Sequence, residues 1–427
     1  MKNKIIVILT DHYLPSNKAS VNRVKSWAKY LPNHNYYPVI FTRNHLNSLY
    51  EYVVQESTHE IHYVKVHESL FLYYRMKFAG TCFEGLFGLM HKILENFLSF
   101  SSMRNLYIST KDYIKSHDVS GILATGPGYK TFIIASRLSD EEQLKWIADY
   151  RDDWSTTEIE KPSIKYLKYY YQSLEKMVLK NASAFISISP WYIKKINNLI
   201  NVKGYLIENG YDLDNDENKG CKNLDPIIKM EQVLDCNKFN IIYPGTLYKT
   251  QSLQYFADML SYLNPEILRK ISFKIIGMKE SDVLSKHIVL NKYHPWLVNI
   301  YERVDKSIAD KYMIDAEAVL HIAHVDSDGN IIKGIPSSKL YDYIKYKKCV
   351  IMAPPDKDIA QEKLTTCGLG IVSESPMELS IKITKLVEDW LVNGSHPNPT
   401  VNIIEYQKNT RECRVEELAK ILDIYFS

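Results

Sequence analysis

Cysteine is scarce in this sequence, and the cysteines present lack the spacing of disulfide or metal ligands. None belongs to a C-x-x-C pair, and none has a histidine partner at the spacing of a zinc site. This argues against a zinc centre and against a disulfide framework. We therefore expect no metal and a reducing, cytoplasmic setting. The six cysteines are Cys82, Cys221, Cys236, Cys349, Cys367 and Cys413.

Long apolar runs and an excess of charge are missing as well. No apolar run reaches the ~18 residues of a transmembrane helix, so none is predicted. The run at residues 5–9 is too short for a signal peptide and predicts a buried first strand. The net charge of +3 comes from 53 basic and 50 acidic residues. That balance excludes a general nucleic-acid binder, and we expect no nucleic-acid partner.

The first strand is not followed by G-x-G-x-x-G, which counts against a dinucleotide-binding dehydrogenase. A chain of 427 residues exceeds the size of one core. Apolar strands alternate with helical patterns through both halves, which predicts an α/β protein with two doubly wound, Rossmann-like domains facing each other across a cleft. The expected parts are a first domain at 1–210, a linker at 211–238, a second domain at 239–404, and a C-terminal helix at 405–427 that packs back on the first domain.

Polar side chains follow the predicted strands of the first half. Open α/β sheets bind their ligands at the carboxyl ends of the strands, so these side chains predict a site. A salt-bridged turn remains an alternative for residues 149–153, where three carboxylates surround one arginine. The candidate residues are Asp11, His12, Lys18, Arg23, Thr125, Gly126, Asp149, Arg151 and Asp152.

Residues 70–100 combine aromatic, aliphatic and basic side chains. From 83 to 100 the apolar residues recur at three- and four-residue steps, which predicts a helix with one continuous apolar face. Core packing is the ordinary interpretation of such a face. Contact with a membrane surface is the alternative, because aromatic and basic residues together suit the headgroup boundary.

The second half brings glycines, hydroxyls and lysines together around two predicted turns. Gly245, Thr246 and Lys249 follow one strand, and Lys339 opens a helix with Asp342 one turn further on. Backbone N–H groups and two cations suit a diphosphate, and a carboxylate suits the hydroxyls of a ribose. The alternative is an ordinary helix start capped by a serine. The second turn contains Gly334, Pro336, Ser337 and Ser338.

Seven segments, in this order, resemble the landmarks of family-4-like bacterial glycosyltransferases of the GT-B fold, closest to the branch that builds O-antigens, capsules and exopolysaccharides. They are Asp11-His12-Tyr13-Leu14-Pro15, Thr125-Gly126-Pro127, Ile147-Ala148-Asp149-Tyr150-Arg151-Asp152-Asp153-Trp154, Ser187-Ile188-Ser189, Ile207-Glu208-Asn209-Gly210-Tyr211-Asp212, Tyr243-Pro244-Gly245-Thr246-Leu247 and Pro336-Ser337-Ser338-Lys339-Leu340-Tyr341-Asp342-Tyr343.

The resemblance implies retaining transfer of a sugar from a nucleotide diphosphate donor, with a UDP-sugar favoured. It implies a glycan or polyprenyl-linked acceptor, as in lipopolysaccharide or capsule synthesis, and no cofactor or metal. Lys249 and Lys339 would stabilise the departing diphosphate. Asp342 would hold the donor ribose. The donor side would further include Gly245, Thr246, Gly334, Pro336, Ser337 and Ser338, and the acceptor side Asp11, His12, Arg23, Thr125, Gly126, Asp149, Arg151 and Asp152.

The sequence departs from the family's pattern in three places. Gly334 stands where the first of two glutamates is usual, Ala19-Ser20 replaces paired glycines, and Lys347 and Cys349 replace a glycine and a proline. The first departure bears on donor recognition. Because of this departure, the alternative that the protein is a catalytically silent subunit, which binds a partner or acceptor, stays open. A nucleotide-sugar epimerase of the same fold is also left open.

Overall fold

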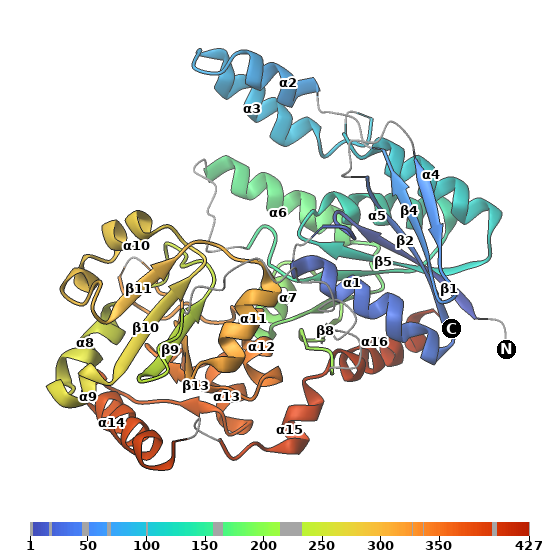
Figure 1. Cartoon of the computed structure of the whole chain (residues 1–427). Coiled ribbons are helices and arrows are strands. Elements are labelled where there is room, and N and C mark those ends of the chain that lie inside the picture. Colours follow the sequence, from blue (N-terminus) through green and yellow to red (C-terminus); the bar gives the residue numbers. More distant parts are fainter. Residues whose placement is uncertain are drawn as a thin grey trace. The chain divides into compact units, whose positions relative to one another are not determined.

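The computed structural model describes residues 3–16, 19–44, 51–65, 70–99, 101–156, 165–213, 233–326, 328–335, 337–394 and 399–426. The chain divides into two compact units (Figure 1). The first comprises Met1–Asn209 with Arg411–Ser427, and the second comprises Gly210–Thr410. Lys18, Pro336 and most of the expected linker lie outside the described residues.

The first unit contains an eight-stranded sheet in the order β3-β4-β2-β1-β5-β6-β7-β8. Every neighbouring pair is parallel except β3 with β4. Because β1 lies between β2 and β5, the strand order reverses at β1, and its carboxyl end is the expected ligand position. The strands are β1 (Lys4–Thr10), β2 (Tyr36–Arg43), β3 (Tyr52–Gln55), β4 (Glu60–Val64), β5 (Val119–Gly126), β6 (Trp146–Tyr150), β7 (Ala184–Ser187) and β8 (Gly204–Leu206).

Helices cover both faces of this sheet. One face packs against α4, α5 and α6, and the other packs against α1 and α16. The ring of Phe426, just after α16, lies on Gly121 of β5, where an added Cβ would come within 2.5 Å of it. The helices are α1 (Ala19–Tyr30), η1 (Leu31–His34), α2 (Leu70–Lys77), α3 (Phe83–Leu94), α4 (Arg104–Ser116), α5 (Lys130–Glu142), α6 (Lys165–Leu179), α7 (Pro190–Asn197) and α16 (Arg411–Tyr425).

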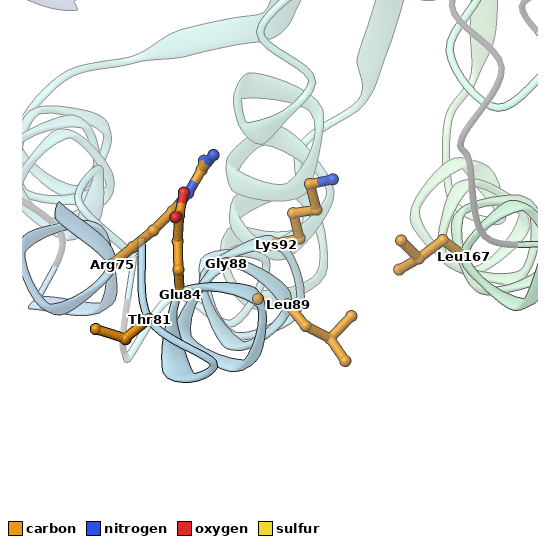
Figure 2. Close-up of a pocket in the computed structure, with 8 residues that line it drawn as sticks. Arg75, Thr81, Glu84, Gly88, Leu89, Lys92 and Leu167 are labelled. Atoms are coloured by element: carbon orange, nitrogen blue, oxygen red, sulfur yellow. The ribbon is translucent and has the colours of Figure 1, made fainter. Parts of the chain in front are cut away.

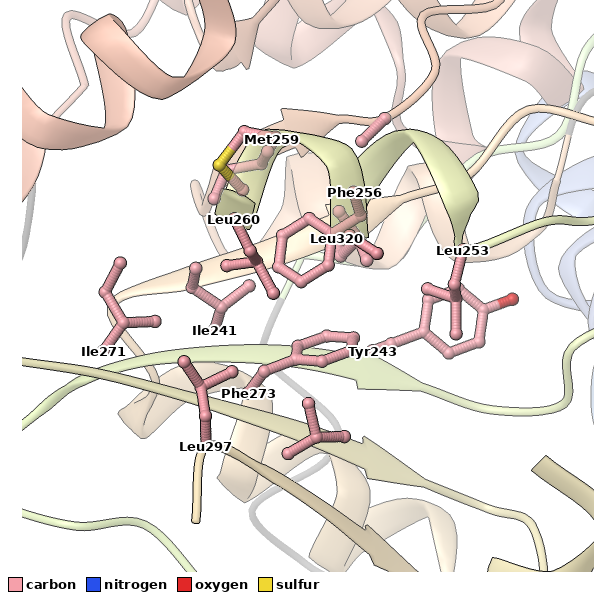
Figure 3. Close-up of a cluster of buried hydrophobic side chains, with 14 of the residues drawn as sticks. Ile241, Tyr243, Leu253, Phe256, Met259, Leu260, Ile271, Phe273, Leu297 and Leu320 are labelled. Carbon is pink, nitrogen blue, oxygen red and sulfur yellow. The ribbon is translucent and has the colours of Figure 1, made fainter. Parts of the chain in front are cut away.

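The second unit contains a six-stranded parallel sheet in the order β11-β10-β9-β12-β13-β14. Here β9 is the strand at which the order reverses. Successive residues of β9 enter opposite cores, since Ile241 and Tyr243 pack with α8 and α14 while Ile242 packs with α12 and α13. In Figure 3, Phe256, Met259 and Leu260 of α8 lie over Ile241 and Phe273.

The strands of the second unit are β9 (Phe239–Pro244), β10 (Ile271–Ile276), β11 (Val298–Tyr301), β12 (Ala318–His321), β13 (Cys349–Met352) and β14 (Gly370–Ile371). Its helices are α8 (Gln254–Tyr262), α9 (Pro265–Arg269), α10 (Glu280–Lys286), η4 (Ile288–Lys292), α11 (Lys306–Asp315), α12 (Lys339–Lys345), α13 (Ile359–Thr366), α14 (Pro376–Asn393) and α15 (Ile403–Lys408). The α/β class with two doubly wound sheets is confirmed.

The core-packing interpretation is wrong for residues 83–94, whereas Leu98 packs against the core of the first unit. The helix α3 ends at Leu94 and has no buried residue. Its apolar face instead meets α2, because the ring of Phe87 stacks on Tyr74 and on Phe78 at centroid distances of 5.4 and 5.3 Å. Two short helices shield only part of each other, so apolar side chains remain exposed.

The C-terminal segment is not one helix from 405. It consists of α15 and α16, separated at Asn409 and Thr410. The side chain of Asn409 donates to the carbonyl of Glu405 at 2.7 Å, and Thr410 bridges to Tyr211 in parallel β geometry. These bonds end α15 inside the second unit before α16 begins in the first.

Candidate functional site

The carboxyl ends of β9 and β10 each carry a glycine turn, and the two turns lie against each other. Gly245 and Gly277 have φ values of +115° and +124°, which side chains rarely adopt. A Cβ at Gly277 would lie 3.1 Å from the Cα of Gly245, and a Cβ at Gly245 would lie 2.7 Å from Cε of Lys339. Glycine at 245 therefore leaves the space that Lys339 occupies.

Lys339 reaches this turn from the first residue of α12. Its amine lies 4.1 Å from the centroid of the Tyr243 ring and donates to the Tyr243 hydroxyl at 2.9 Å. The carbonyl oxygen of Thr246 lies 3.5 Å from the same amine. The ring, the hydroxyl and the glycine turn thus fix the position of the cation.

The charge of Lys339 has no counter-charge in the described part of the chain. No described carboxylate pairs with it, and burial lowers its pKa from 10.5 to about 8. A cation taken out of water without a partner is unfavourable, so such a position is most stable with an anion bound. The N–H of Thr246 likewise has no acceptor among the described residues and lies at the same turn.

Two histidines lie beside Lys339 and were not among the predicted site residues. Burial, together with the charge of Lys339, lowers the pKa of His321 to about 3 and also lowers the pKa of His324. Both are therefore neutral at pH 7 and add no positive charge. The Nδ1 of His324 lies 2.7 Å from the hydroxyl of Thr250. His321 ends β12 and His324 follows three residues later, so the available signal was a pair of histidines at the carboxyl end of an apolar strand.

Lys249, the other predicted cation, is exposed and lies four residues after Gly245. It makes no hydrogen bond or ion pair with the described residues. Its long side chain is therefore available to a ligand at the same turn. Thr246, which lies between Gly245 and Lys249 in the sequence, is exposed as well.

The loop before α12 holds the remaining predicted donor residues. The hydroxyl of Ser337 accepts from the amide of Lys339 at 3.3 Å, whereas Ser338 is the N-cap residue but makes no side-chain cap bond. Gly334 is buried at a φ of +82°, and its amide donates to the carboxylate of Asp358. Asp342 faces Lys306, with its Oδ2 3.2 Å from that amine.

In the first unit, Arg23 of α1 and Asp149 of β6 form a buried ion pair, and Thr125 of β5 is hydrogen-bonded to it. The guanidinium of Arg23 contacts Asp149 at 2.8 Å, and the hydroxyl of Thr125 donates to the same carboxylate at 2.7 Å. Arg23 also donates to the carbonyls of Ile207 and Glu208 at 3.0 Å each. These contacts join α1 to three strand ends, so the pair holds this edge of the sheet together.

Of the other predicted residues in the first unit, Asp11 and Arg151 are buried, His12 is partly exposed and Asp152 is exposed. Asp11 follows β1 and pairs with Arg43, and His12 Nε2 lies 3.2 Å from its carboxylate. Arg151 is buried and donates to the carbonyl of Gly126. Asp152 is exposed, although partial desolvation by the surrounding residues raises the pKa of its carboxyl. This edge of the sheet therefore presents a carboxylate and an imidazole to solvent.

Metal ligands and membrane spans were also sought in the residues that the structure describes. No group of three or more His, Cys, Asp or Glu side chains among them is placed to hold a metal ion. No helix in the same residues combines the length and the apolar character needed to cross a bilayer.

Two doubly wound α/β units of this kind define the GT-B fold, and solved structures with that fold match nearly the whole chain. No family model and no curated protein matches the sequence. Sucrose-phosphate synthase from Thermosynechococcus elongatus is similar with a TM-score of 0.64 and 10% identity over 99% of both chains. HepE from Anabaena, in complex with UDP and glucose, has a TM-score of 0.58 and 14% identity over 99% of this chain and 100% of that one.

A trehalose-6-phosphate structure from E. coli, bound with UDP-2-fluoro glucose, has a TM-score of 0.61 and 11% identity over 98% of this chain and 99% of that one. At identities this low, the structural similarity shows only that the proteins share a fold. The chain therefore has the GT-B fold.

Proposed function

We propose that this protein is a retaining, family-4-like glycosyltransferase that moves a sugar from a nucleotide diphosphate, with a UDP-sugar favoured, to a growing glycan. The acceptor is carried on a polyprenyl lipid, as in lipopolysaccharide or capsule synthesis. The protein acts in the cytoplasm at the inner face of the membrane. Similar solved structures that hold UDP, UDP-glucose or a fluorinated UDP-glucose support the choice of donor.

The buried amine of Lys339 is the observation that carries this proposal. It is a fixed cation without a described counter-charge, at the strand where the sheet order reverses. A diphosphate supplies the missing negative charge, and the N–H of Thr246 supplies a hydrogen bond to it.

The same groups serve the reaction. When the bond between the sugar C1 and the diphosphate oxygen breaks, negative charge grows on that oxygen, and Lys339 and Lys249 stabilise it. The proposed reaction needs no metal, because these cations take the role that magnesium has elsewhere. Asp342 accepts hydrogen bonds from the donor ribose, and the first unit contributes the acceptor side through Asp11, His12 and Asp152.

A catalytically silent subunit that binds a partner or acceptor is the second candidate, and Gly334 favours it. The glutamate usual at this position in the family is absent, and the amide of Gly334 is bonded to Asp358 instead. Under this alternative the protein binds the nucleotide but forms no product.

Turnover with a panel of UDP- and GDP-sugars and a polyprenyl diphosphate-linked acceptor tests the proposal. We expect product in the presence of EDTA. Lys249→Ala should lower kcat on the order of 100-fold, the loss typical of removing one charge-stabilising donor. Lys385→Ala, at an exposed lysine of α14, is the matched control and should leave kcat unchanged. Nucleotide binding without product would favour the silent subunit, and full activity of Lys249→Ala would remove that residue from the mechanism.

A further inference from the structure

The helices α2 and α3 form a hairpin that exposes large apolar side chains on the first unit (Figure 1). Met76 of α2 is 71% exposed, and Phe83 and Leu86 of α3 are 53% and 52% exposed. Phe97, just beyond α3, is 54% exposed. Apolar side chains gathered in this way usually mark an interaction surface rather than ordinary protein exterior.

The helix α6 continues this surface. The hydroxyl of Tyr170 lies 3.4 Å from the carbonyl of Ile93 and also 3.4 Å from the side-chain amide of Asn96, so α6 contacts the end of α3. Tyr166 and Met177, four residues before and seven residues after Tyr170, lie on the same face of α6 and are 84% and 66% exposed. Aromatic side chains with a polar end suit the boundary between lipid headgroups and acyl chains.

The charge of the three helices is strongly one-sided. Their sequences contain six lysine or arginine residues and two glutamates. One of the glutamates, Glu175, is buried and accepts from the hydroxyl of Tyr150 at 2.7 Å. The exposed cations Lys77, Lys92 and Lys168 come from the same three helices as the exposed apolar side chains, and this combination complements the surface of an anionic bilayer.

A pocket of about 310 Å³ lies within this surface. Arg75, Glu84 and Lys92 line it together with Leu89 of α3 and Leu167 of α6 (Figure 2). The guanidinium Nε of Arg75 lies 3.9 Å from Glu84, which leaves the ion pair long and both side chains partly open to solvent. The cations of this pocket could bind the phosphate of a phospholipid, and the leucines beside them could contact the start of the lipid's acyl chain.

We propose that α2, α3 and α6 together dock on an anionic phospholipid bilayer. The exposed apolar residues enter the headgroup boundary, and the cations contact lipid phosphates. The inference deepens the membrane placement in the proposed function and rests on that placement alone. Vesicle binding and donor turnover are separate measurements, so failure of one is distinguishable from failure of the other.

Flotation of the full chain with vesicles tests the proposal. We expect binding to vesicles of phosphatidylcholine and phosphatidylglycerol in equal parts, with much weaker binding to phosphatidylcholine alone. The double variant Met76→Asp, Leu86→Asp should remain unbound. The matched control Ile381→Asp, Val392→Asp changes two residues of α14 that are 64% and 84% exposed, and it should bind like the wild type.

The charge requirement is tested by replacing Lys77, Lys92 and Lys168 with glutamine. Each lysine near an anionic surface contributes roughly fivefold in affinity, so the triple variant should bind on the order of 100-fold more weakly. Salt at about 0.5 M should weaken the wild type in the same direction. Soluble donor turnover, where it is present, should be unchanged in every variant.

Three results would overturn the proposal. The first is a wild type that does not bind anionic vesicles. The second is a double aspartate variant that floats as well as the wild type. The third is a wild type that binds equally to vesicles of both compositions. A wild type that forms dimers, lost in the double aspartate variant, and that ignores vesicles would assign this surface to a second copy of the chain instead.

Discussion

Replacing Lys339 with methionine separates the stability of the second unit from its binding function. Methionine has nearly the length of lysine and remains apolar over the ring of Tyr243, which lies 4.1 Å from the native amine. The variant therefore removes the charge while it leaves the space beside Gly245 filled. We expect a protein without ligand that is more stable than the wild type.

The size of this gain follows from the pKa of Lys339, which burial lowers from 10.5 to about 8. At about 1.4 kcal/mol for each pH unit between the two values, the cost of the buried charge is at most ~3.5 kcal/mol. The side chain is partly accessible, which reduces the expected gain to about 2 kcal/mol.

The dependence on pH has a definite sign. Below pH 8 both the folded and the unfolded chain carry the proton on Lys339, and the folded state bears the full cost of the charge. Between pH 8 and pH 10.5 the folded state loses this proton first, so the cost disappears and wild-type stability rises. The advantage of Lys339→Met should be largest at pH 7 and should vanish near pH 10.5.

Urea unfolding at pH 7 and near pH 10, with calorimetric binding of UDP and GDP, provides the assay. Loss of a charge-assisted hydrogen bond should weaken nucleotide binding roughly 10- to 100-fold. The control Lys249→Met removes an exposed lysine, so it should leave the free energy of unfolding unchanged. Equal or lower stability of Lys339→Met at pH 7, or unchanged nucleotide affinity, would refute the reasoning.

Two further variants test other parts of the molecule. Arg23→Met leaves the carboxylate of Asp149 buried without its partner, and we expect a loss of about 3–5 kcal/mol in the free energy of unfolding, measured with urea; a loss below about 1 kcal/mol would show that this pair does not hold the sheet edge. Gly334→Glu restores the family's residue at a φ of +82°, where a side chain costs roughly 1 kcal/mol. We expect lower stability and no gain in donor affinity by calorimetry, and tighter donor binding would contradict this.

Much of the strand framework could be predicted because parallel strands buried on both faces appear as continuous apolar runs. The strands β1, β6 and β9 are of this kind, and every residue of β6 and β9 is buried. The antiparallel pair β3 and β4 was missed, since its strands are short and mix polar with apolar residues.

The burial of α3 could not be predicted in the same way. A periodic apolar face predicts a helix, but it does not specify whether the partner is a sheet or another small helix. Here the partner is α2, which cannot cover the face completely.

The candidate donor site was partly predictable. Local turn chemistry placed Gly245 and Lys339 each beside a turn, but residues 243 and 339 are 96 positions apart. That the ring of Tyr243 would lie under the amine depends on the strand order β9-β12, which no local pattern specifies. The neutral state of His321 depends on the same long-range packing.

A crystal structure of the protein with UDP and EDTA tests the central claim most directly. The account predicts that the diphosphate lies roughly 3 Å from both the amine of Lys339 and the N–H of Thr246, with no metal ion between them. UDP bound elsewhere on the second unit, or a site that stays empty at saturating UDP, would contradict it.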